Sequence, residues 1–176
     1  YLSSMHACER ELGELVVRVC EGQVTDLTEY ESISLAAESL ALAPAQRSAV
    51  SLAARSSFMI LTGGPGTGKT TTVKAILRLL ASTGENILLA APTGRAAKRL
   101  SETTGQPAST LHRLLGYNPM DGFRFDEDDP LDAAAIIVDE ASMLDQALAV
   151  AFLRAVSPGT RVILVGDADQ LPSVGA

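Results

Sequence analysis

The chain reads Gly63-Gly64-Pro65-Gly66-Thr67-Gly68-Lys69-Thr70 at the point where an apolar run gives way to a helical pattern. Glycines let backbone N–H groups turn inward around phosphate oxygens, and the N-terminal end of the following helix adds partial positive charge. Lys69 is placed to reach the β- and γ-phosphates of a nucleotide, and the Thr70 hydroxyl to ligate Mg²⁺. A glycine-rich turn that merely ends a strand is the alternative, but strand, loop, lysine, threonine and helix all occur in the required order. We therefore expect ATP with Mg²⁺ to bind here, through Gly64, Pro65, Gly66, Thr67, Gly68, Lys69, Thr70 and Thr71.

The sequence around this loop alternates short apolar runs with helical patterns. The runs are apolar on both faces, as in buried parallel strands, and cover 58–61, 87–90, 135–138 and 162–165. Helical spacing fills the intervals, and also residues 5–21 and 44–55 before the first run. Strands that alternate with helices predict an α/β fold with a parallel sheet. For 23–42 we expect a short strand or turn and then a helix near 34–42, and for 116–132 a surface excursion with a small hairpin.

A second part of a nucleotide site follows the apolar run at 135–138. Asp139 and Glu140 come at the carboxyl end of this strand, where open parallel sheets bind ligands. Asp139 is placed to hold Mg²⁺ through its outer shell beside Thr70, and Glu140 is the natural general base for an attacking water. An acidic pair that only caps a helix is the alternative, which the complete phosphate loop disfavours. Gln170 follows the next strand and is placed to report loss of the γ-phosphate, although a polar turn explains its position equally well.

The totals of the chain are those of a globular domain, with 176 residues of which 47% are hydrophobic and 20% charged. No apolar run reaches the roughly 18 residues that a membrane helix needs, and the N-terminus lacks the pattern of a signal peptide. Cys8 and Cys20 fit no metal motif, so we expect both to fill the core from one apolar helix face, in a reducing cytoplasm. The formal net charge of −7 argues mildly against nucleic acid as a partner.

A phosphate loop predicts a nucleotide site and leaves the function open. A GTP switch would need Asn-Lys-x-Asp, and a transporter ATPase would need Leu-Ser-Gly-Gly-Gln; the sequence contains neither. A small-molecule kinase would carry an arginine-rich lid and usually lacks an Asp-Glu pair. The acidic pair at 139–140 therefore favours an ATPase that activates water, such as a motor or remodelling enzyme.

Several segments resemble the signature motifs of superfamily 1 helicases. Residues 63–72 resemble motif I, 91–97 motif Ia, 138–143 motif II and 166–175 motif III. The segments 110–116, 122–123 and 129–131, and the opening helix with Tyr1-Leu2 and Glu9-Arg10-Glu11, are similar to RecD-like superfamily 1B helicases. The similarity is greatest to the long stand-alone bacterial type, which is like the exodeoxyribonuclease V alpha subunit. The resemblance covers nearly the whole chain, and these motifs in this order are highly specific.

The resemblance implies roles that chemistry alone would not single out. Gln46 is similar to the adenine-reading glutamine of the family, an amide that donates and accepts at once, although a surface residue on a helix is the simpler interpretation. Gln170 matches the motif III glutamine that couples the γ-phosphate to DNA, and completes an expected catalytic set with Lys69 and Glu140. Contact with single-stranded DNA, chiefly its backbone, is implied for Pro92, Thr93, Gly94, Arg95 and His112. For His112, a partly buried side chain packed on Leu115 explains the position almost equally well.

The resemblance further implies a RecA-like three-layer domain over 43–176, preceded by a helical segment over 1–42. The family order inserts the 162–165 strand between the 58–61 and 135–138 strands and leaves the 87–90 strand at an edge. The implied activity is ATP-driven 5′ to 3′ translocation along single-stranded DNA, with unwinding of duplex ends in repair or recombination. A nucleotide-dependent subunit that binds DNA ends or partner proteins without being a motor is the alternative.

The family grips DNA in a groove shared with a second RecA-like domain, which answers the objection from charge. Few cations of one half need line such a groove, and the cations of 95–113 lie near the implied strand-contacting segments. Motifs IV, V and VI, with the arginine that completes the ATP site, would follow Ala176. We therefore expect the chain to belong to a longer protein, to work with that second domain and with nuclease or repair partners, and to be nearly inactive alone.

Overall fold

The computed structural model describes residues 3–30 and 42–167, and its centre is a five-stranded sheet. The strand order across the sheet is β1-β5-β4-β2-β3. The strands are β1 (Phe58–Thr62), β2 (Ile87–Ala91), β3 (Ala108–Thr110), β4 (Ala135–Val138) and β5 (Arg161–Gly166). Every neighbouring pair of these strands runs parallel, so their carboxyl ends lie at one edge of the sheet. The predicted α/β class and parallel sheet are confirmed.

The strand order agrees with the prediction at one position and differs at another. β5 lies between β1 and β4, as predicted. The prediction that the 87–90 strand forms an edge is wrong, because β3 pairs outside it, with Ala108 opposite Leu89. The residues of β3 are Ala-Ser-Thr and all are half-buried, so this strand has no apolar run that could announce it.

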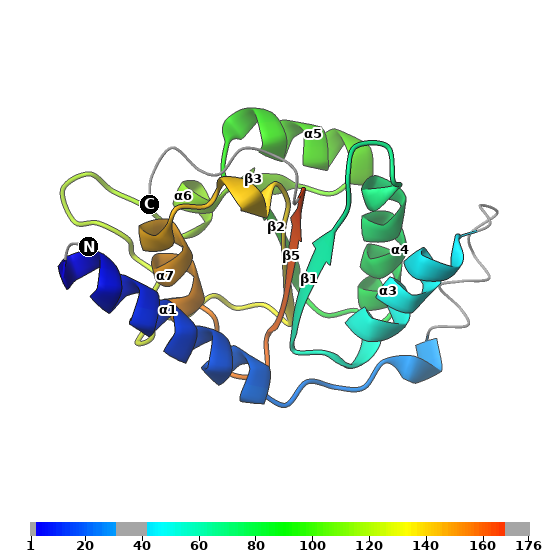
Figure 1. Cartoon of the computed structure of the whole chain (residues 1–176), viewed down its shortest axis with the longest axis horizontal. Helices are drawn as coiled ribbons and strands as arrows, with labels where there is room; N and C mark the ends of the chain where they lie inside the picture. Colours follow the sequence, from blue (N-terminus) through cyan, green and yellow to red (C-terminus); the bar gives the residue numbers. More distant parts are fainter. Residues whose placement is uncertain (1–2, 31–41, 168–176) are drawn as a thin grey trace.

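Two helical layers cover the sheet and give the three-layer arrangement visible in Figure 1. One layer consists of α3 (Pro44–Arg55) and α4 (Lys69–Ala81), and the other of α1 (Ser3–Glu21) and α7 (Gln146–Arg154). Ile76 and Leu79 of α4 share a buried cluster with Ile163, whereas Phe152 of α7 shares another with Val162. Neighbouring residues of β5 thus serve two cores, which explains why the strand is continuously apolar. Among the helices of residues 3–30 and 42–167, none combines the length and apolar character of a membrane span.

β1 departs from the expectation of a strand buried on both faces. Met59 is 4% exposed, whereas the next residue, Ile60, which points to the opposite face, is 60% exposed. β1 is an edge strand of the described sheet, and the cluster beneath α1 and α7 includes Phe58 but not Ile60. The apolar run therefore predicts the strand correctly and its burial wrongly, because such a run does not distinguish a central strand from an edge strand.

Polar contacts fix α1 against α7. Glu11 and Arg154 form an ion pair that joins the two helices. The guanidinium of Arg18 donates to the backbone carbonyls of Leu153 and Val156, at the C-terminal end of α7. A cation at this end of a helix also interacts favourably with the partial negative charge of the last carbonyls. The predicted N-terminal helix is confirmed, and it is an integral layer of the fold.

The prediction that Cys8 and Cys20 both fill the core is wrong for one of them. Cys8 is half-buried, but Cys20 is exposed. Their separation of 12 residues is about three and a third helical turns, so the two thiols point in different directions.

The segment after α1 is irregular and is held by a buried arginine. Residues 23–27 form no strand, and the expected helix near 34–42 falls almost wholly outside the described residues. Arg161, at the start of β5, is 4% exposed, and burial lowers the pKa of its guanidinium. It donates to three backbone carbonyls, those of Thr25 at 2.8 Å, Ser56 at 3.0 Å and Ala54 at 3.1 Å. One side chain therefore ties this segment to the end of α3 and to the sheet.

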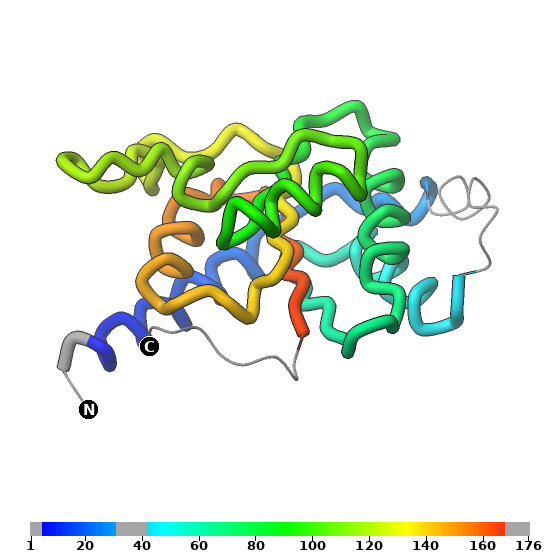
Figure 2. Tube along the Cα trace, turned by 90° about the horizontal axis from the view of Figure 1, so that it is seen from above, coloured from blue at the N-terminus to red at the C-terminus, as the bar shows by residue number. Residues whose placement is uncertain are grey.

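Residues 116–130 project beyond the sheet at the end opposite α4 (Figure 2). An antiparallel bridge between Asn118 and Gly122 forms the predicted small hairpin, and Met120 at its tip is 90% exposed. Phe123 and Phe125 pack against the cluster beneath α1 and α7. The excursion is therefore anchored to the domain by its aromatic residues.

Candidate nucleotide site and strand-contacting segment

The loop between β1 and α4 has the conformation of a phosphate cradle. Gly66 and Gly68 have φ angles of 76° and 84°, in the left-handed region that favours glycine. A Cβ at Gly63 would lie 2.6 Å from the Thr67 hydroxyl, so only glycine lets that hydroxyl approach the backbone here so closely. α4 begins at Lys69, and its positive end therefore faces the loop.

The side chain of Lys69 is turned onto the loop. Its ammonium donates to the carbonyls of Gly63 and Gly64 and lies 3.6 Å from Oδ2 of Asp167, the residue that follows β5. The lysine side chain is 22% exposed and the aspartate side chain 4% exposed. A cation is thus held at the mouth of the cradle, and Asp167 is a contact that the sequence interpretation did not include.

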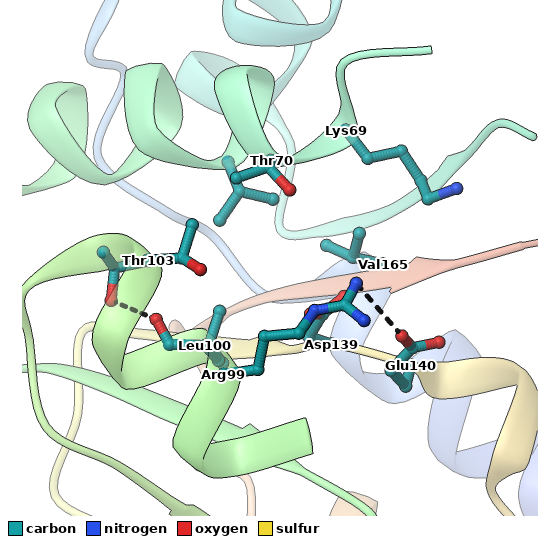
Figure 3. Close-up of a pocket in the computed structure, with 10 residues that line it drawn as sticks. Lys69, Thr70, Arg99, Leu100, Thr103, Asp139, Glu140 and Val165 are labelled. Atoms are coloured by element: carbon teal, nitrogen blue, oxygen red, sulfur yellow. Dashed lines mark hydrogen bonds and ion pairs between the residues drawn. The ribbon is translucent and has the colours of Figure 1, made fainter. Parts of the chain in front are cut away.

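Asp139 and Glu140 reach the same pocket from the end of β4. Both line it together with Lys69 and Thr70, as Figure 3 shows. The Asp139 amide donates to the Ala90 carbonyl at 2.9 Å, which continues the contact between β4 and β2 beyond the strand. Glu140 has a φ of 54°, the one left-handed non-glycine residue within 3–30 and 42–167. Such backbone strain tends to gather at functional sites.

The opposite wall of the pocket comes from α5 (Gly94–Thr104). Arg99, Leu100, Thr103 and Thr104 line it, and Nη2 of Arg99 lies 3.7 Å from Oε1 of Glu140. Sequence reasoning placed Arg99 among the cations near the DNA strand and missed this contact. The available signal was the position of α5, because a helix that follows the carboxyl end of a central strand runs beside the ligand site.

Gln46 lies against the loop, from the first turn of α3. Its Oε1 accepts from the Ala43 backbone amide at 2.9 Å, while its Nε2 donates to the carbonyls of Gly68 at 3.3 Å and Thr67 at 3.5 Å. The structure therefore brings Gln46 to the nucleotide loop, although these are contacts within the protein and not with an adenine.

The segment 92–95 lies at the same edge of the sheet, directly after β2. The Thr93 hydroxyl accepts from the Ala96 amide at 3.2 Å and caps α5, so it has a structural role in addition to any contact with DNA. Gly94 and Arg95 are exposed, and Pro92 is half-buried. An exposed arginine beside a helix N-terminus suits a phosphate.

His112 lies on α6 (Leu111–Leu114) and is exposed. Its ring centroid is 5.3 Å from that of Tyr117 and 5.8 Å from that of Phe123, both in the excursion. The alternative of a partly buried histidine on Leu115 is therefore wrong. The ring belongs to a surface group of aromatic side chains.

A family model described as the AAA domain matches residues 46–176. The chain belongs to this family.

Within the AAA-domain family, the chain is similar to RecD-like helicases. It is 56% identical over 119 residues to the ATP-dependent RecD2 DNA helicase of Deinococcus radiodurans, covering 68% of this chain and 16% of that protein. It is 46% identical over 154 residues to the RecBCD enzyme subunit RecD of Mycobacterium tuberculosis, covering 74% of this chain and 27% of that protein. The predicted assignment to RecD-like superfamily 1 is confirmed. The chain spans only about a quarter or less of the length of these relatives.

Solved structures show the same fold. Bacteroides Pif1 bound to single-stranded DNA matches with a TM-score of 0.55 and 28% identity, over 78% of this chain and 34% of that one. The Pif1 helicase from Candida albicans matches with a TM-score of 0.57 over 77% of this chain and 34% of that one; at 23% identity this likeness shows the fold alone. The predicted RecA-like fold is confirmed.

The RecD-like assignment leaves one predicted residue without a position. Gln170 lies outside the described residues, although β5 and Asp167, which precede it, end beside Lys69. Its role stays a prediction.

Proposed function

We propose that residues 43–176 form the first motor domain of an ATP-dependent DNA helicase, with 1–42 as a helical segment packed against it. ATP hydrolysis drives 5′ to 3′ translocation on single-stranded DNA and unwinding of duplex ends, in repair or recombination in the cytoplasm. The observation that carries the proposal is one pocket in which Lys69 and Thr70 meet Asp139 and Glu140. The names of the relatives, an ATP-dependent RecD2 DNA helicase and a RecBCD enzyme subunit RecD, support the same activity.

The residues present fit ATP with Mg²⁺. The left-handed backbone of Gly66 and Gly68 suits a loop whose N–H groups turn inward onto phosphate oxygens. Mg²⁺ in such sites takes few protein ligands and several from phosphate and water, which suits Thr70 as a ligand with Asp139 in the outer shell. When bound, the metal neutralises charge on the transferring phosphoryl group.

In the proposed mechanism each side chain has one task. Lys69 leaves the loop carbonyls to pair with the terminal phosphates. Glu140 accepts a proton from the attacking water through its carboxylate. The side-chain amide of Gln46 gives up its hydrogen bonds to the loop carbonyls and bonds to the edge of an adenine instead. Gln170 couples the presence of the γ-phosphate to DNA binding.

The proposed DNA groove uses Pro92, Thr93, Gly94, Arg95 and His112, completed by a second RecA-like domain. Because its contacts are chiefly with phosphates, we expect binding to weaken as salt rises. Nuclease or repair proteins are further proposed partners.

The test is ATP hydrolysis by the intact protein with and without single-stranded oligonucleotide. A motor hydrolyses ATP faster when DNA is bound and unwinds a duplex with a single-stranded tail. Binding of DNA with no stimulation would favour the alternative, a nucleotide-dependent subunit that is not a motor.

A further inference from the structure

The carboxylate of Glu140 has an ion-pair partner on the wall of the pocket. Nη2 of Arg99 lies 3.7 Å from Oε1 of Glu140, and the dashed line in Figure 3 marks this contact. The arginine side chain is 73% exposed, whereas the glutamate side chain is 20% exposed. The proposed general base is therefore fixed from β4, and its partner reaches it from the solvent side.

We propose that Arg99 is a positioning residue that restrains Glu140 until a nucleic-acid phosphate takes its guanidinium. The proposal rests on the function proposed above and deepens it. In the ground state the arginine holds the carboxylate oxygen that must accept the proton of water.

Arg99 lies on α5 where a phosphate of a bound DNA strand can compete with Glu140 for its guanidinium. Arg95, in the proposed strand-contacting segment, stands one helical turn earlier, about 6 Å along the helix axis. A strand bound at this end of α5 places a phosphate within reach of a long and exposed arginine side chain. Guanidinium groups bind phosphate in a bidentate manner, so the exchange replaces one anionic partner by another.

The proposed release of Glu140 requires that its ion pair with Arg99 be weak. The Arg99 side chain is largely in solvent and 3.7 Å from the carboxylate, so its pairing is loose and one new anionic partner is enough to displace it. DNA at the end of α5 would then release Glu140 for hydrolysis, and the coupling would need no movement of the strands. Lys98, the preceding residue, provides a contrast, because it pairs with Glu102 along the same helix at 3.8 Å and not with the pocket.

The experiment compares Arg99→Gln with Lys98→Gln in the intact protein, which removes one exposed cation from α5 in each case. Arg99→Gln is expected to raise kcat without DNA about two- to fivefold, the range that an exposed ion pair supplies. KM for ATP stays unchanged, and stimulation by a single-stranded oligonucleotide falls by a similar factor. Arg99→Lys retains the positive charge and restores most of the restraint, and Lys98→Gln leaves kcat without DNA as in the wild type. Equal thermal unfolding midpoints show that the variants are folded.

An unchanged or lowered kcat without DNA in Arg99→Gln overturns the proposal. A raised KM for ATP overturns it as well, because Arg99 would then bind the nucleotide. If the wild type shows no stimulation by DNA, the proposed function fails and the phosphate exchange fails with it. Even in that case, the kcat of Arg99→Gln without DNA, compared with that of the wild type, shows whether Arg99 restrains Glu140.

Discussion

Gln46 and Gly68 lie so close that a methyl group at position 68 would collide with the amide nitrogen of Gln46. That nitrogen donates to the Gly68 carbonyl at 3.3 Å, while the amide oxygen of Gln46 accepts from Ala43 at 2.9 Å. The side chain thus joins the start of α3 to the phosphate loop. Gln46, which is proposed to bind adenine, therefore also supports the loop that holds the phosphates.

Gly68→Ala is expected to destabilise the domain more than Gly84→Ala. Both glycines have φ angles in the left-handed region, 84° at position 68 and 72° at position 84. Alanine at either position therefore lowers the free energy of unfolding by about 1–2 kcal/mol. Position 84 has nothing within 4 Å of an added Cβ, whereas position 68 displaces Gln46 and its hydrogen bonds, roughly 0.5–1.5 kcal/mol more. Urea denaturation measures both, and in a double-mutant cycle Gln46→Ala should cost less in the Gly68→Ala background. Strictly additive losses would show that the two residues are not coupled.

Lys69→Ala is expected to weaken binding of ATP with Mg²⁺ about 10- to 100-fold, since a hydrogen bond to a charged group contributes roughly 1.5–3 kcal/mol. Lys74→Ala is the matched control, because Lys74 lies on the same helix and lines a different hollow, with Arg78 and Glu102. Isothermal titration calorimetry decides between them. Unchanged affinity in Lys69→Ala would remove the nucleotide assignment of the loop.

The sequence predicted the parts of the fold that depend on local pattern. The loop at 63–70, four strands and the order of β5 between β1 and β4 followed from apolar runs and from motif resemblance. β3 was not predicted because Ala108–Thr110 is short and half-buried, and it is a strand only through its pairing with β2. The exposure of Ile60 was not predicted because the burial of a strand residue depends on which helices cover the strand.

The site was predictable to the extent that its residues sit in a motif. Lys69, Thr70, Asp139 and Glu140 line one pocket, because parallel strands deliver their carboxyl ends to one edge. The position of α5 beside the site was predictable, but the contact of Arg99 with Glu140 was missed because it also depends on the rotation of α5 about its axis. Asp167 was likewise missed, because the resemblance to motif III drew attention to Gln170.

Arg161→Met is expected to lower the free energy of unfolding by about 3 kcal/mol or more. The substitution removes a buried cation and its donors to Thr25, Ala54 and Ser56, and unsatisfied buried carbonyls are costly. Arg10→Met is the control, because Arg10 is 74% exposed and pairs with an equally exposed Glu14. We expect that control to change stability by less than about 0.5 kcal/mol. Similar denaturation midpoints for the two variants would contradict the role of Arg161 as a tie.

Changing Arg95 and His112 together to alanine in the intact protein should reduce DNA-stimulated ATP turnover more than turnover without DNA. Arg95 is exposed at the start of α5, and the His112 ring belongs to the aromatic group with Tyr117 and Phe123. Arg95→Ala tested alone separates the phosphate contact from any change in that packing. An equal fall in both rates would show that the residues are structural and that the DNA assignment fails.

Glu140→Gln separates binding from chemistry. The amide keeps the size and the left-handed backbone of the residue but has no basic oxygen to accept a proton, while Lys69, Thr70 and Asp139 remain in the pocket. We expect the intact protein to bind ATP with nearly wild-type affinity and to hydrolyse it about 10²–10⁴-fold more slowly, the usual contribution of a positioned base. Glu102→Gln, which removes an exposed carboxylate that pairs with Lys98 on α5 and does not line the pocket, should retain wild-type turnover. Single-turnover hydrolysis together with calorimetry makes the distinction, because a variant that binds ATP and still hydrolyses it rapidly would require another group to activate the water.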